Sequence, residues 1–162
     1  MIVDQYLTHH QWMRQAFDLA RQAGEAGEIP VGAVIVNQQG EIIARGENRR
    51  ERDKDPTAHA EIIALRAAGK FYETWHLEQC TLYVTLEPCP MCSGAIILAR
   101  IGLLVYATSD PKTGSIRTVS NLPDSKTANH HLAICAGIME WECQSLLNNW
   151  FSQKRYQSKS KF

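Results

Sequence analysis

The segment Thr81-Leu82-Tyr83-Val84-Thr85-Leu86-Glu87-Pro88-Cys89-Pro90-Met91-Cys92 decides the fold, because it joins an apolar run to a pair of cysteines. Its first six residues are mostly β-branched, aromatic or aliphatic, which favours a β-strand. The apolar stretch 93–99 favours a buried helix, and Pro88 suits the start of that helix. The sequence therefore predicts a strand that delivers two thiols to a helix start, where the helix dipole favours ionised sulfur.

A second short cluster, Thr57-Ala58-His59-Ala60-Glu61, also has the pattern of a first helical turn, because it follows the start signal Asp55-Pro56. His59 offers a ring nitrogen, and Cys89 and Cys92 offer two thiolates. Three such ligands suit one zinc ion per subunit and leave one coordination position open, which is typical of a catalytic rather than a structural site. We therefore expect these three residues to bind Zn²⁺.

Glu61 is the expected proton carrier of this site. It lies two positions from His59, so the two side chains point in different directions around a helix and are not expected to share the metal. A carboxylate beside activated water can accept a proton and pass it on. We also expect backbone N–H groups near Ala60 and Cys89 to stabilise developing negative charge. On its own, Glu61 would be an ordinary acid of a first helical turn.

The cysteine pair alone has two other common uses, in redox-active proteins and as half of a structural zinc site. The residues around Cys89 and Cys92 lack the Trp-Cys-Gly-Pro pattern of a redox pair, and no second pair of ligands completes a structural site. The joint pattern is more specific. His-x-Glu, the 26 intervening residues 62–87 and Pro-Cys-x-x-Cys match the signature of zinc nucleobase deaminases.

The composition is that of an ordinary globular domain without an overall charge. Its 162 residues are 44% hydrophobic, and 17 basic side chains balance 17 acidic ones. Any contact with nucleic acid must therefore be local. Of the five cysteines, Cys80, Cys135 and Cys143 lie in apolar surroundings and are expected to pack in the core. No disulfide framework, signal peptide or membrane-spanning stretch is recognisable, which favours a cytoplasmic protein.

The predicted elements follow the order helix, strand, strand, helix, strand, helix, strand, long loop, strand, helix. This order favours an α/β fold with three layers (α/β/α) and one mixed five-stranded sheet. The charged segment 47–55 is expected to be a solvated loop, and 108–131 a long polar connection. Residues 1–155 are expected to form one zinc-dependent deaminase domain. Residues 156–162 are expected to form a basic tail that either contacts phosphates or is merely solvated.

The chain resembles the bacterial tRNA-specific adenosine deaminases, a family with the cytidine deaminase-like fold. The likeness extends from about Tyr6 to Arg155 and is carried by the segments IPVGAV (29–34), DPTAHAEI (55–62), LYVTLEPCPMC (82–92) and DPKTG (110–114). The zinc cluster is shared with other deaminases. The Thr-Leu-Glu-Pro-Cys form, the Asp-x-Lys-Thr-Gly segment and the aromatic-then-basic C-terminal helix look specific to this family.

This resemblance implies hydrolysis of adenosine to inosine at the wobble position (34) of a tRNA anticodon, mainly in an arginine tRNA, by a homodimer. It implies that His59, Cys89 and Cys92 bind zinc and that Glu61 is the proton shuttle. Six further residues have implied substrate-binding roles. Asn48 would hold the flipped base, Leu86 would form a pocket wall, and the anticodon loop would be handled by Asp110, Lys112, Phe151 and Arg155. The chain departs from the family in the segment 115–131 and at Trp150, where the family often has phenylalanine.

Two other functions remain open at the level of sequence. The first is a small-molecule deaminase that acts on guanine, cytosine or deoxycytidylate, because a neutral chain can bind a small substrate equally well. The second is a non-catalytic, zinc-stabilised RNA-binding module in which Glu61 is only a helix-start acid. The segment 110–114 and the basic tail favour the tRNA enzyme, because a small-molecule enzyme has less reason to carry them.

Overall fold

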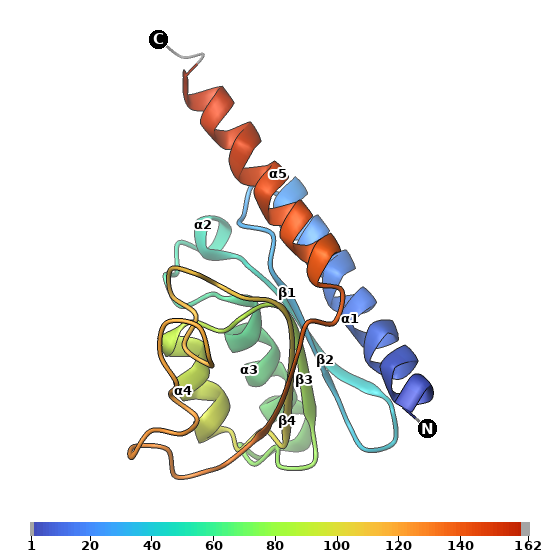
Figure 1. The fold of residues 1–162 in the computed structure, drawn as a ribbon. Coiled ribbons are helices and arrows are strands. Elements are labelled where there is room, and N and C mark those ends of the chain that lie inside the picture. The colour runs from blue at the N-terminus through green and yellow to red at the C-terminus, as the bar shows by residue number, and fades with distance from the viewer. Residues whose placement is uncertain (1, 160–162) are drawn as a thin grey trace.

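A mixed sheet of five strands forms the middle layer of the protein (Figure 1). The computed structural model describes the backbone of residues 2–159 and the side-chain burial of residues 4–158. The strands lie in the order β2-β1-β3-β4-β5; β1 is antiparallel to β2 and β3, whereas β4 is parallel to β3 and β5. Their bounds are β1 Gly32–Val36, β2 Ile42–Glu47, β3 Thr81–Leu86, β4 Leu103–Thr108 and β5 Ala133–Ala136. The predicted mixed five-stranded sheet is confirmed.

Two pairs of helices cover the two faces of the sheet, which confirms the three-layer α/β/α prediction (Figure 1). Successive strand residues point to opposite faces, so Tyr83 joins the core beneath one helix pair while Leu82 and Val84 join the core beneath the other. The first pair is α1 (Ile2–Glu25) and α5 (Glu140–Lys159), and the second is α3 (Ala60–Tyr72) and α4 (Pro90–Leu98).

The charged segment 47–55 differs from expectation, because it contains the short helix α2 (Arg50–Asp53) instead of only a loop. An ion pair across one helical turn accounts for the difference. Nε of Arg49 lies 2.9 Å from a carboxylate oxygen of Asp53, four residues later. Such pairs stabilise a helical turn that has no apolar face.

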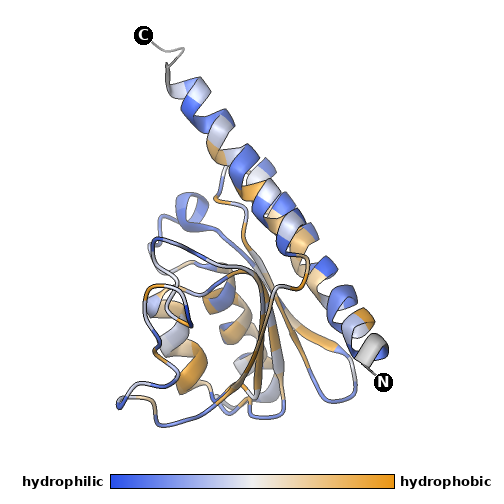
Figure 2. Cartoon of the chain, viewed as in Figure 1, coloured by the Kyte–Doolittle hydropathy of each residue, from blue (hydrophilic) through white to orange (hydrophobic). Residues whose placement is uncertain are grey.

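The long helix α5 extends beyond the body of the protein. It continues without interruption past position 155, where the sequence predicts the domain to end, and residues 160–162 of the predicted tail lie outside the described residues. Figure 2 shows hydrophobic residues in the strands and in α4, whereas the projecting end of α5 is mostly hydrophilic. Within residues 2–159, every helix is too short or too polar to cross a membrane.

The three cysteines outside the metal cluster only partly match their prediction. Cys80 and Cys143 are buried in the core. Cys135 is only half-buried, because it lies on β5 at the edge of the sheet, where neighbouring side chains cover one side only.

The packing of α3 against β2 requires a glycine at position 46. A Cβ atom on Gly46 would overlap the carbonyl oxygen of Ala60 and lie 2.8 Å from the backbone nitrogen of Ala64. Backbone atoms cannot move aside as the end of a flexible side chain can, so this close approach needs a residue without a side chain. The contact fixes the first turn of α3, next to His59, against the sheet.

Candidate active site

The two sequence clusters lie at the N-terminal ends of α3 and α4. His59 and Cys89 are the residues directly before the first helical residue of each helix, and both have extended backbone conformations. Cys92 lies in the first turn of α4 and is completely buried. Pro90 occupies the first helical position, where the missing N–H of proline leaves no partner unsatisfied. A helix follows each cluster as predicted, but α3 begins at Ala60, so residues 57–59 precede the helix and do not form its first turn. Likewise, Pro88 precedes α4 and does not open it.

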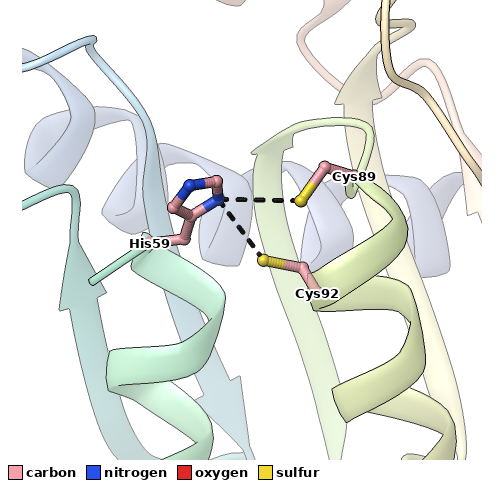
Figure 3. A group of neighbouring side chains, drawn as sticks. All are labelled: His59, Cys89 and Cys92. Atoms are coloured by element: carbon pink, nitrogen blue, oxygen red, sulfur yellow. Dashed lines mark hydrogen bonds between the residues drawn. The ribbon is translucent and has the colours of Figure 1, made fainter. Parts of the chain in front are cut away.

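Three donor atoms converge between these helix starts (Figure 3). Nδ1 of His59 lies 3.7 Å from Sγ of Cys89 and 3.5 Å from Sγ of Cys92. A nitrogen about 2.0 Å and a sulfur about 2.3 Å from a tetrahedral zinc ion are roughly 3.6 Å apart. The donor set therefore fits one zinc ion in both chemistry and spacing. Among the residues that the structure describes, no fourth His, Cys, Asp or Glu side chain belongs to this group.

The close approach of the three donors also controls their ionisation. A hydrogen bond from Cys92 lowers the pKa of Cys89 to about 4. The same contact and burial raise the pKa of Cys92, because a second thiolate would lie beside the first. The hydrogen bond to Cys89 raises the pKa of His59. A divalent cation removes the repulsion between the two thiolates, so the fully ionised donor set requires a metal ion.

Glu61 lies beside this group in the first turn of α3. Its side chain is only 4% exposed, and this burial raises its pKa to about 7. A carboxyl group with such a pKa both accepts and releases protons near neutral pH. Glu61 lies close enough to Cys92 to help raise the pKa of that thiol, but it is not one of the converging donors. It therefore leaves the fourth position open, and its role as the proton carrier stays a prediction.

Asn48 connects the first turn of α3 to the segment before β1. Its Oδ1 accepts a hydrogen bond from the N–H of Ala60 at 3.0 Å, and its Nδ2 donates one to the carbonyl of Ile29 at 3.0 Å. The N–H of Ala60 itself is therefore already paired, and stabilisation of negative charge by other backbone N–H groups near Ala60 and Cys89 stays a prediction. One lone pair on Oδ1 and one hydrogen on Nδ2 remain available, so Asn48 can also bind the edge of a base.

Five of the six residues predicted to bind substrate line one cavity of about 590 Å³, which we call the β3-end cavity. Asn48 lines a second cavity of about 530 Å³, and Phe151 and Ile29 line both. The structure thus brings together side chains from the end of β3, the connection after β4 and the exposed side of α5. The five residues of the β3-end cavity are Leu86, Asp110, Lys112, Phe151 and Arg155.

The side chain of Asp110 is largely occupied within its own turn. Oδ1 accepts hydrogen bonds from the N–H groups of Lys112 and Thr113, and Oδ2 accepts one from the hydroxyl of Thr113. These bonds fix a tight turn at one wall of the β3-end cavity. Asp110 therefore shapes the cavity wall, and a direct contact with the anticodon loop stays a prediction.

Comparison with known proteins agrees with this geometry. Residues 7–108 match the cytidine and deoxycytidylate deaminase zinc-binding region. The tRNA-specific adenosine deaminase of Bacillus subtilis (strain 168) is 44% identical over 149 residues, which are 92% of each chain. The chain belongs to the tRNA-specific adenosine deaminase family. A solved structure from a study of A-to-I editing by tRNA:A34 deaminases at the wobble position of transfer RNA has a TM-score of 0.82 and 41% identity, over 85% of this chain and 99% of that one.

This member of the tRNA-specific adenosine deaminase family also shares its fold with a small-molecule enzyme. The guanine deaminase of Nitrosomonas europaea has a TM-score of 0.74 and 26% identity, over 87% of this chain and 83% of that one. The TM-score and the sequence identity are both lower than for the tRNA:A34 deaminase. The small-molecule deaminases that the sequence left open are therefore the more distant relatives.

Two basic residues line the cavity that contains Asn48: Arg50 from the charged segment 47–55 and Lys154 from the basic end of α5. Residues four apart on a helix are neighbours, and Nζ of Lys154 lies 5.2 Å from the centre of the Trp150 ring. Sequence reasoning assigned no role to Glu87, which is completely buried. No local pattern signals its role, because the residues that bind its carboxylate follow 23 to 31 positions later.

Proposed function

We propose that this protein hydrolyses adenosine to inosine at the wobble position of a tRNA anticodon, with zinc bound by His59, Cys89 and Cys92. One observation carries the proposal: three donors at zinc spacing lie beside a buried carboxyl group that does not fill the fourth position. A structural zinc site has four protein ligands, whereas a hydrolytic one keeps a position for water.

Zinc in a three-ligand site supplies a Lewis acid that ionises water near neutral pH. Glu61 accepts the proton that this ionisation releases and delivers it to N1 of the adenine ring, which makes C6 more electrophilic. After the hydroxyl oxygen bonds to C6, Glu61 takes the remaining proton of that hydroxyl and delivers it to the 6-amino group, which leaves as ammonia when its C–N bond breaks. Its raised pKa suits this shuttle, because the carboxyl group changes protonation state at little cost near pH 7.

Asn48 and Leu86 hold the base, and the other four residues of the β3-end cavity bind the neighbouring nucleotides. A base must leave its stack to reach a site at the foot of two helices, and a single-stranded anticodon loop makes this inexpensive. Lys112, Arg155 and Lys154 supply local positive charge for phosphates, although the whole chain has none in excess. We take an arginine tRNA as the first substrate to test, and the cytoplasm as the place of action.

We propose a homodimer that is formed through the groove between α3 and α4. This groove has a volume of about 960 Å³ and is lined by apolar side chains that include Leu65, Trp75 and Leu98. Trp75 is 59% exposed and Leu98 65% exposed in the single chain. Burial of such a patch in a second copy removes apolar surface from water. Light scattering tests this: Leu98→Glu should halve the molar mass in solution.

The test of the proposed function is incubation of the zinc-loaded protein with an anticodon stem-loop that carries adenosine 34. Free adenosine, guanine, cytosine and deoxycytidylate are assayed in parallel, and inosine and ammonia are measured. We expect inosine from the stem-loop and none from the small molecules. Faster release of ammonia from guanine or cytosine would show a small-molecule deaminase. Bound zinc without ammonia from any substrate would show a non-catalytic module.

A further inference from the structure

Glu87 is a completely buried acid that the proposed chemistry does not use, although it lies directly before Pro88 and Cys89. Its two carboxylate oxygens accept hydrogen bonds from one later stretch of chain, residues 110–118, which we call the 110–118 segment. Oε1 accepts the N–H groups of Ile116 (3.1 Å), Arg117 (2.8 Å) and Thr118 (3.0 Å). Oε2 accepts the N–H of Asp110 (3.1 Å) and the hydroxyl of Thr118.

Further contacts join the same segment to the turn before α4. The N–H and the hydroxyl of Ser115 both donate to the carbonyl of Pro88, at 3.0 and 3.1 Å. Ser93, in the first turn of α4, shares a hydrogen bond of 2.7 Å with Ser115. A side chain at Gly114 would meet the Glu87 carboxyl carbon at 2.6 Å, so the segment approaches Glu87 as closely as its backbone allows.

These contacts link two parts of the proposed site. One end of the 110–118 segment carries Lys112, which lines the β3-end cavity. The turn to which the segment is bound continues within two residues into Cys89. The hydrogen bonds to a buried carboxylate are charge-assisted, which makes them stronger than bonds between neutral groups.

We propose that Glu87 is a positioning residue that holds the 110–118 segment against the turn that leads into Cys89. The wall of the β3-end cavity that carries Lys112 then keeps a fixed distance from the metal ligands. The inference rests on the proposed function, since it assumes that the wall binds RNA. Glu87 acts through this segment and does not touch the substrate. Its loss therefore weakens binding of the stem-loop, while the chemical step at saturating RNA continues.

Glu87→Gln is the sharpest test, because it keeps the shape of the side chain. An amide has one oxygen that accepts and one nitrogen that only donates. Whichever way the amide points, one of the two groups of donors faces the NH₂ group and loses its acceptor. Thr118→Val is a milder variant at an exposed position, and it removes only the hydroxyl contact. Glu41→Gln is the control, because Glu41 is an exposed carboxylate that accepts a bond from Asn37 in the β1–β2 turn.

Limited trypsin digestion measures, without reference to activity, how firmly Glu87 holds the 110–118 segment. Trypsin cuts after Lys112 and Arg117 inside the segment and after Lys126 beyond it, and all three side chains are exposed. In Glu87→Gln, we expect cleavage at Lys112 and Arg117 to accelerate about tenfold, because local opening exposes these bonds. Cleavage at Lys126 should stay unchanged, and Glu41→Gln should match the parent at all three bonds.

Steady-state kinetics with the stem-loop measure the consequence for RNA. We expect Glu87→Gln to raise KM about tenfold and Thr118→Val about threefold, with kcat and zinc content close to the parent in both. A general loss of folded protein would instead lower kcat and leave KM unchanged. Either that pattern or equal trypsin cleavage in the parent and both variants would overturn the proposal. If the parent does not deaminate the stem-loop, the proposed function fails. The trypsin digestion still tests whether Glu87 holds the 110–118 segment in place.

Discussion

Substitution of Gly46 offers a quantitative test of how the fold positions the metal ligands. The Cβ atom of Gly46→Ala would overlap the Ala60 carbonyl oxygen and lie 2.8 Å from Ala64 N. Carbon and nitrogen atoms without a bond between them rest near about 3.5 Å. The first turn of α3 must therefore move away from β2 by roughly 1 Å. That turn carries Glu61 and follows His59 directly, so both shift relative to the cysteines on α4.

Two magnitudes follow from this displacement. Overpacking of this kind costs about 2 kcal/mol of folding free energy, which lowers Tm by ~4–8 °C for a chain of this size. A displacement of about 1 Å in the reacting geometry lowers turnover about 100-fold. The assays are calorimetry, zinc content by mass spectrometry, and inosine formation on the anticodon stem-loop.

Gly94 provides the matched control. It lies inside α4, also near the site, but a Cβ atom there would meet no atom within 4 Å. Gly94→Ala should therefore stabilise the protein by about 0.5–1 kcal/mol through helix propensity and leave turnover unchanged. If Gly46→Ala retained the Tm and turnover of the parent, the reasoning on close helix–strand packing would be refuted.

Four further outcomes are expected. Glu61→Ala should keep zinc and fold but lower turnover at least about 100-fold, and residual activity within about tenfold of the parent would contradict a proton shuttle. Cys89→Ala should lose zinc, and unchanged metal content by mass spectrometry would remove Cys89 from the ligand set. Truncation after Phe151 should keep the fold and weaken RNA binding. It should also reduce the slope of log affinity against log salt concentration by about one to two. Unchanged affinity would show that the end of α5 does not contact RNA. For Glu28, burial alone would raise its pKa, but hydrogen bonds from the N–H groups of Arg52 and Glu51 hold the pKa below its ordinary value. A carboxyl group whose pKa is depressed by folding stabilises the folded state above its unfolded pKa, and this contribution is lost as pH falls through the folded pKa. Urea unfolding from pH 6 to pH 3 should therefore show a steeper loss of stability in the parent than in Glu28→Gln, and parallel profiles would contradict the linkage.

The sequence predicted those features that depend on local pattern. Residues 81–86 form β3 as expected, because a short run of mostly β-branched, aromatic and aliphatic side chains favours a buried strand. Helices follow both clusters as expected, because the charged and proline-containing segments around them are typical helix starts, although α3 begins one residue after His59. The ordering of these elements then restricted the fold to a mixed sheet covered on both faces.

The sequence did not predict which polar groups would become partners across the fold. The N–H of Ala60 looked available, yet Asn48, twelve positions earlier, accepts its hydrogen bond. The five donors that surround Glu87 come from a connection with no regular structure, so no periodicity reveals them. Helix α2 was missed because its stability depends on an ion pair and not on an apolar stripe. Such partnerships are set by the tertiary arrangement, which local pattern does not encode.

The hydrogen bond from Ala60 to Asn48 has a consequence for interpreting mutants. The first N–H groups of a helix have no partner within the helix, and a serine, threonine, aspartate or asparagine at the position before the helix usually accepts a hydrogen bond from one of them. In α3 that position is occupied by His59, whose side chain makes no such bond. Instead, the side-chain oxygen of Asn48, from outside the helix, accepts the hydrogen bond from Ala60. A substitution at Asn48 will therefore loosen the support of the histidine as well as any grip on the base, and reduced zinc retention should accompany reduced substrate affinity.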